Sequence, residues 1–119
     1  MPRMLDVREE LLARLEAQYR SSGWVPVRRD TAEVLHAAGP GGVTWFGMAI
    51  LPDDLNSAAE LGERIVDLSA RRMPGGELCV LDLLPAPECH DAVAELLARL
   101  GLASSANISL YALPAAAAA

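Results

Sequence analysis

Hydrophobic residues recur at helical spacing in three parts of the chain. The predicted helices cover residues 5–20, 57–72 and 87–100. Two of them begin with a capping pattern, because an acidic residue follows a polar one by three positions, as Glu9 follows Asp6 and Glu60 follows Ser57. The third begins with Pro87 near its first position, which suits a residue with no N–H to offer.

Between these helices lie shorter segments with the pattern of strands. The predicted strands cover residues 24–27, 32–37, 43–51, 78–84 and 106–113. Pro26 favours an edge position for the first strand, since proline cannot donate a hydrogen bond to a neighbour. Residues 43–51 and 78–84 are apolar on both faces, which is typical of interior strands, and 78–84 is the best candidate for a central strand.

The resulting order is α-β-β-β-α-β-α-β. Helical crossovers join the last three strands, so they should be mutually parallel, while the first strands add an antiparallel part. We therefore predict an α/β fold with a mixed sheet, with α+β as the alternative class. Residues 1–113 would form a single domain and the alanine-rich residues 114–119 a disordered tail.

The charged residues exclude several functions. The net charge is −6, and all ten basic residues are arginines, so P-loop and Schiff-base mechanisms that need lysine are ruled out for this chain. Neither a nucleic-acid partner nor an anionic membrane is expected for so acidic a protein. The start of the sequence lacks a signal-peptide pattern and no apolar run is long enough for a membrane span, so a cytoplasmic location is expected.

Half of the arginines are explained by their spacing. Each follows an acidic residue by four positions on a predicted helix: Glu10 and Arg14, Glu16 and Arg20, Glu60 and Arg64, Asp67 and Arg71, Glu95 and Arg99. Such pairs stabilise a helix by ~0.2–0.5 kcal/mol each. The others remain available for ligand or partner contacts: Arg3, Arg8, Arg28, Arg29 and Arg72.

Ligands of open α/β sheets bind at the carboxyl ends of the strands. Two such ends, near residues 51 and 84, should lie together and would gather Asp53, Asp54, Cys89 and His90, with Asp82 nearby in its strand. Carboxylates and an imidazole could bind a divalent metal there. The competing interpretation is that acidic residues collect at helix N-termini because the helix dipole favours them, and we prefer it.

Cys89 and Asp82 have alternatives of their own. A helix N-terminus could activate the Cys89 thiol, but His90 is its neighbour in sequence and would point elsewhere, so a buried structural cysteine is the preferred interpretation. Asp82 is the one charge within an apolar strand, and could be a functional carboxylate or an acceptor of structural hydrogen bonds. No catalytic residue is assigned, and no cofactor is expected.

Three resemblances rest on the order of elements. The opening α-β-β-β-α-β order resembles the core of PD-(D/E)xK nucleases and tRNA-splicing endonuclease domains, but Trp45-Phe46-Gly47-Met48 replaces the required acid-x-lysine, so such a relative would be catalytically dead. The same opening resembles type III secretion chaperone-like domains, which are small acidic dimers. Residues 43–113 resemble STAS regulatory domains, although no serine stands where the regulatory serine is required.

The preferred function is a small acidic interaction or regulatory module without catalytic activity, chaperone-like and homodimeric, that binds a protein partner. Its interface would use apolar surface around Trp24, Trp45 or Tyr111. The acidic charge, the high apolar content and the lack of a credible catalytic set motivate this hypothesis. The alternatives are a small metal-assisted or thiol-dependent enzyme that uses the strand ends, and a catalytically dead nuclease-like domain that binds nucleic acid.

Overall fold

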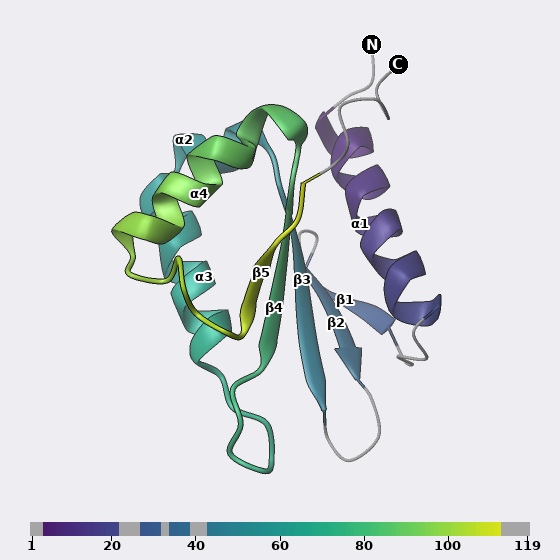
Figure 1. Ribbon diagram of the computed structural model, residues 1–119. Coiled ribbons are helices and arrows are strands. Elements are labelled where there is room, and N and C mark those ends of the chain that lie inside the picture. The colour runs from purple at the N-terminus through teal and green to yellow at the C-terminus, as the bar shows by residue number, and fades with distance from the viewer. Residues whose placement is uncertain (1–3, 22–26, 32–33, 39–42, 113–119) are drawn as a thin grey trace.

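The computed structural model describes residues 4–21, 27–31, 34–38 and 43–112. Its described elements have the predicted order (Figure 1). The helices are α1 (Met4–Ser21), α2 (Pro52–Asn56), α3 (Ala58–Ala70) and α4 (His90–Arg99), with a short 3₁₀ turn η2 (Pro87–Cys89) before α4. The strands are β1 (Val27–Thr31), β2 (Val34–Ala38), β3 (Thr44–Ile50), β4 (Val80–Pro85) and β5 (Ile108–Leu110).

The five strands form one mixed sheet in the order β1-β2-β3-β4-β5. The pairs β1–β2 and β2–β3 are antiparallel, whereas β3–β4 and β4–β5 are parallel. This confirms the predicted α/β class, the mixed sheet and its parallel C-terminal part. Both strands expected in the interior are there, although β3 and not β4 is the middle strand.

Helices cover both faces of the sheet, in three layers (Figure 1). Helix α1 lies on one face, where its apolar stripe of Leu11, Leu12, Leu15 and Tyr19 is buried against the strands. Helices α3 and α4 lie on the other face and bury Leu61, Ile65, Leu68, Val93 and Leu97. Successive residues of a strand point to opposite faces, so β4 serves both layers of the core.

Two predictions about boundaries are wrong. The first strand includes Val27–Thr31, beyond the predicted end at residue 27, because an edge strand can carry a charged sequence such as Arg28-Arg29-Asp30 that hydrophobic patterning does not mark. The predicted loop before α3 contains the short helix α2.

The capping box predicted for Ser57 and Glu60 is also wrong, since the Ser57 side chain caps nothing. The chain before Ser57 is already helical, and the Ser57 N–H donates to the Asp54 carbonyl. Asp54 provides the cap instead, at the start of α2, where its carboxylate accepts from the Leu51 N–H at 2.8 Å.

Several expectations concern residues outside the described part. These are Arg3, the strand residues 24–26 with Trp24, and the tail at 114–119. In the part that is described, no helix combines the length and the apolar character that a membrane span requires.

Candidate functional site

The carboxyl ends of β3 and β4 lie side by side, as the sequence indicates. Ile50 and Pro85 are register partners in the parallel pair, and the Ala86 N–H donates to the Ile50 carbonyl at 2.9 Å. Helix α2 starts directly after β3, and η2 starts directly after β4. This edge of the sheet therefore brings Asp53, Asp54, Cys89 and His90 into one region.

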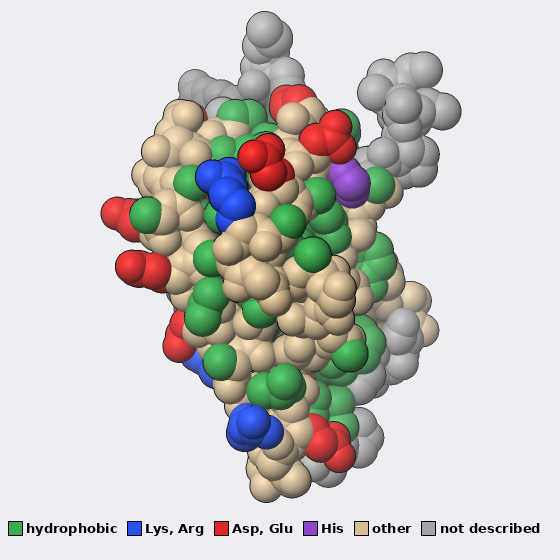
Figure 2. Space-filling model, turned by 60° about the vertical axis from the view of Figure 1, so that its left-hand side comes forward, with side chains coloured by type: hydrophobic (Ala, Val, Ile, Leu, Met, Phe, Trp, Pro, Cys, Tyr) green, Lys and Arg blue, Asp and Glu red, His purple; other side chains and the backbone are tan. Residues whose placement is uncertain are grey.

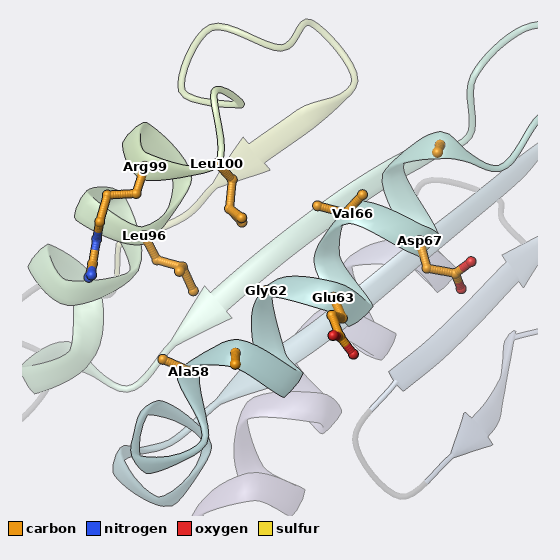
Figure 3. A pocket seen from close by; sticks show the side chains of 10 residues that line it. Ala58, Gly62, Glu63, Val66, Asp67, Leu96, Arg99 and Leu100 are labelled. Atoms are coloured by element: carbon orange, nitrogen blue, oxygen red, sulfur yellow. The ribbon is translucent and has the colours of Figure 1, made fainter.

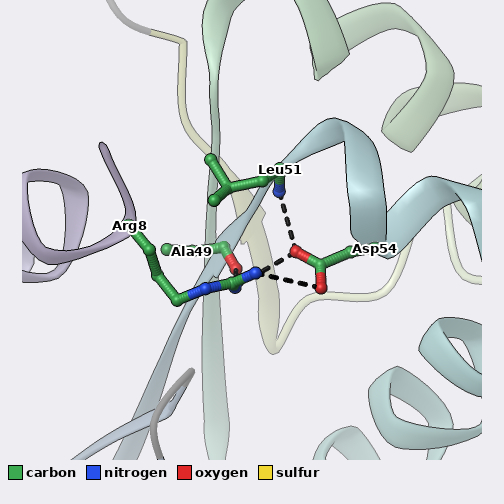
Figure 4. Close-up of polar contacts among 4 residues, drawn as sticks. All are labelled: Arg8, Ala49, Leu51 and Asp54. Carbon is green, nitrogen blue, oxygen red and sulfur yellow. Dashed lines mark hydrogen bonds and ion pairs between the residues drawn. The ribbon is translucent and has the colours of Figure 1, made fainter. Parts of the chain in front are cut away.

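Asp54 is engaged in an ion pair with Arg8 (Figure 4). Arg8 Nη1 lies 3.1 Å from Asp54 Oδ2 and Nη2 lies 3.2 Å from Oδ1, while Nη1 also donates to the Ala49 carbonyl at 3.2 Å. The two side chains are only 12% and 11% exposed. Arg8 thus connects α1 to the end of β3 and to the start of α2. It is one of the arginines that the acid–base spacing on the predicted helices did not explain.

The other residues of this edge do not converge. Asp53 is exposed, and His90 faces Asp91, with Nδ1 and Oδ1 3.3 Å apart. Nowhere in the described ranges do three His, Cys, Asp or Glu side chains form a group that could hold a metal ion. The acids at this edge are accounted for by helix starts and by Arg8.

Cys89 is buried, with 2% of its surface exposed. Burial raises the pKa of the Cys89 thiol, and the nearby carboxylates of Glu88 and Asp54 raise it further. Burial also raises the pKa of Cys79, which is likewise buried. Both thiols are therefore held in the protonated, unreactive form.

Asp82 lies away from this edge, on the face of β4 that α1 covers. It is 1% exposed, and its Oδ2 accepts a hydrogen bond of 2.7 Å from the Tyr19 hydroxyl. Gly47 is its register partner on β3, and a Cβ at Gly47 would come within 2.7 Å of the Tyr19 oxygen. The glycine thus leaves the space through which Tyr19 reaches Asp82.

The environment of Asp82 disfavours its charge. Burial raises the pKa of the carboxyl, and the hydroxyls of Tyr19 and Tyr111 offset part of that rise. Its Oδ1 has no partner of hydrogen-bond geometry within the described part of the chain, although Tyr111 lies near enough to affect its pKa. Burial and the neighbouring Asp82 in turn raise the pKa of both tyrosines.

Two of the three aromatic residues expected at an interface, Trp45 and Tyr111, are partly buried against other parts of the chain. Trp45 is partly buried and meets Tyr19 edge to face, with ring centroids 6.0 Å apart. Tyr111, also partly buried, borders a small cavity of about 210 Å³ together with Arg14 and Gln18 of α1. Trp24 lies outside the described residues.

A larger hollow lies between α3 and α4, on the opposite face of the molecule from α1. Figure 2 shows hydrophobic side chains exposed over this face, with acidic side chains along one margin. The hollow, which we call the α3–α4 groove, has a volume of about 700 Å³. Its apolar lining consists of Ala58, Ala59, Gly62, Val66 and Ala70 from α3, Leu96 from α4, and Leu100 directly after α4.

Charged side chains lie on the two sides of the groove (Figure 3). Glu63 and Asp67 stand on the edge of α3 that is turned away from α4, and Arg99 rises from α4 on the other side. Val66 is 42% exposed, which is unusual for a large aliphatic residue in this fold. The groove therefore combines an open apolar floor with one acidic and one basic side.

The sequence interpretation missed the groove. Its residues come from two helices separated by about thirty positions, and only their packing creates the hollow. A signal was present in α3, however. Gly62 interrupts an otherwise good helical segment, where glycine costs ~1 kcal/mol relative to alanine.

The protein is thus a three-layer α/β/α protein with an apolar groove on its surface. Comparison with known proteins gave no match, since no family model, no curated protein and no solved structure corresponds to the chain. The nuclease, chaperone and STAS resemblances thus rest on the order of elements alone, and fold order does not specify function.

Proposed function

We propose that the protein is a protein-interaction module without catalytic activity, and that the α3–α4 groove is its binding surface. The observation that carries this proposal is an apolar groove of about 700 Å³ with an exposed valine at its side. Contiguous apolar surface of this kind marks interaction sites in proteins. Grooves between two helices commonly receive the apolar face of a third.

The state of the candidate catalytic groups favours this function over the enzyme alternative. A thiol mechanism needs an accessible thiolate, whereas Cys89 is buried and its pKa is raised. A metal mechanism at the strand ends needs free carboxylates, whereas Asp54 is bound to Arg8. The net charge of −6 likewise disfavours nucleic acid as the partner.

The lining of the groove supports a proposal for the chemistry of the partner. Small residues along α3 allow a close approach, so the bound segment should be a helix with a short apolar stripe. The acidic edge with Glu63 and Asp67 would attract basic residues of the partner, and Arg99 would attract acidic ones. A helix with opposite charges on its two sides would meet both requirements.

Co-purification from the native cell tests this proposal with two matched variants. Gly62→Trp places a bulky ring at the buried floor of the groove, where α3 meets Leu96 and Leu100, and Ala13→Trp adds the same side chain to an exposed position of α1 on the other face. Circular dichroism checks that both variants are folded. We expect wild type and Ala13→Trp to retain a partner, identified by mass spectrometry, that Gly62→Trp loses. Cross-links to that partner should map to residues 58–70 and 96–100. Equal recovery by all three proteins, or cross-links to other surfaces, would refute the proposal.

A further inference from the structure

We infer that the groove is occupied by helix α3 of a second copy of this chain, in a two-fold dimer whose axis runs along the groove. This inference rests on the proposed function, because it names the partner of the same surface. In such a dimer each α3 lies in the groove of the other copy. The contact is isologous, so each favourable contact occurs twice.

The charges select this direction of the two-fold axis. Rotation about an axis along the groove exchanges its two sides, so the edge of α3 that carries Glu63 and Asp67 meets Arg99 of the other copy. An axis across the groove would instead place the acidic edge of one copy against the acidic edge of the other. Juxtaposed like charges disfavour association, so complementary charge supports the first arrangement.

The shape of α3 suits the same arrangement. Val66 projects from the helix with 42% of its surface exposed, whereas Gly62, one turn earlier, is buried against the Leu96 and Leu100 side chains. Val66 therefore offers the apolar surface that a second α3 would cover.

The charged residues of the groove are free to change partners. Asp67 pairs with Arg71 at 2.9 Å and Arg99 with Glu95 at 3.9 Å, and the four side chains are 49–72% exposed. Exposed pairs of this type contribute little, ~0.2–1 kcal/mol each. They can therefore be exchanged for contacts across the dimer without a large loss.

Sedimentation equilibrium of the full chain tests the inference through charge reversal. Wild type should form a dimer, and Arg99→Glu or Glu63→Arg alone should each weaken it by roughly tenfold, because two attractions per dimer become repulsions. An equimolar mixture of the two variants should regain wild-type affinity, since both contacts of the mixed dimer are then complementary. Glu10→Arg and Arg14→Glu, a matched exposed pair on α1, should leave association unchanged.

The possible outcomes separate this inference from the proposed function. A chain that stays monomeric at its highest soluble concentration, while Gly62→Trp still loses an identified partner, overturns the dimer and keeps the interaction module. If neither charge reversal weakens the dimer, or if the mixture of the two variants does not regain the wild-type affinity, the arrangement of the two copies is overturned. Circular dichroism of each variant ensures that a loss of association is not a loss of folding.

Discussion

At the scale of single residues, Asp82, Gly47 and Tyr19 depend on one another. Asp82 is the one acidic side chain among the fully buried residues of the described chain, and it is held by the Tyr19 hydroxyl. That hydroxyl fits only because Gly47 has no side chain. The sequence singled out Asp82 as the charge in an apolar strand, but its partner lies 63 positions earlier, so the pairing was not visible in any local pattern.

The first prediction concerns pH. Burial raises the pKa of Asp82 above the value of about 3.9 that a free aspartate has. At pH values between the unfolded pKa and the higher folded pKa of Asp82, the folded chain binds more protons than the unfolded chain. The stability linked to Asp82 is therefore fully present below the unfolded pKa and is lost as the pH rises through the folded pKa. Asp82→Asn should lack this loss when urea unfolding is followed from acidic to neutral pH.

The matched control is Asp53→Asn, which changes an exposed carboxylate. The loss of stability with rising pH should persist in this variant, because Asp82 is unchanged. If the free energies of unfolding of wild type and Asp82→Asn keep a constant difference over the whole range, Asp82 does not titrate as its burial predicts.

The second prediction concerns Gly47. Alanine at this position would place a Cβ 2.7 Å from the Tyr19 oxygen and 3.2 Å from Leu15 Cδ1. Gly47→Ala should therefore lower the free energy of unfolding by ~1–3 kcal/mol, the usual cost of overpacking a core. Combined with Tyr19→Phe, which removes the crowded oxygen, it should cost less than the sum of the two changes. Additive costs in denaturant titrations would contradict this geometry.

At the scale of elements, local patterns predicted the long helices and the interior strands well. Their hydrophobic spacing is set by the faces that they bury, and those faces are read directly from the residues. The start of α3 after Ser57 was predicted correctly, but the capping contact was not, because the Ser57 side chain makes no capping hydrogen bond and Asp54 caps the unexpected helix α2 before it. The ion pair of Arg8 with Asp54 was missed for another reason, since it joins elements 46 positions apart.

The third prediction concerns that ion pair. Arg8→Met would leave the largely buried Asp54 carboxylate without its cation and would remove the Arg8 hydrogen bond to the Ala49 carbonyl. We expect a loss of ~1–3 kcal/mol in the free energy of unfolding, because hydrogen bonds to charged groups of low exposure are costly to remove. Arg14→Met removes the exposed pair with Glu10 and should cost below ~1 kcal/mol. Equal losses in the free energy of unfolding for the two variants would show that the contact of Arg8 with Asp54 stabilises the fold no more than an exposed ion pair does.

At the scale of the whole molecule, the two helical layers differ in how they cover the sheet. Helix α1 closes its face of the sheet, with Tyr19 and Arg8 as its polar attachments. Helices α3 and α4 cover the other face but leave an apolar groove on their outer side. Composition and charge led us to expect an interaction module, which stays a prediction, but they could not point to the groove, which depends on how two helices pack.

The fourth prediction concerns both thiols, which report on opening of the entire core. Cys79 and Cys89 are buried, and burial raises the pKa of each. In the native protein they should react with iodoacetamide slower than a model thiol by ~100-fold or more, because reaction requires the fold to open. Addition of urea should accelerate both together. Rapid alkylation of Cys89 alone in the native protein would instead support the alternative of a thiol-dependent enzyme.

The separation of Tyr19 and Asp82 along the chain also has a consequence for synthesis on the ribosome. Helix α1 is made first, but the carboxyl group to which it binds follows 63 residues later. At roughly 5–20 residues per second, this leaves about 3–13 s in which the apolar stripe of α1 lacks the strand that completes its cover. The nascent chain is thus an expected client of chaperones until β4 has emerged.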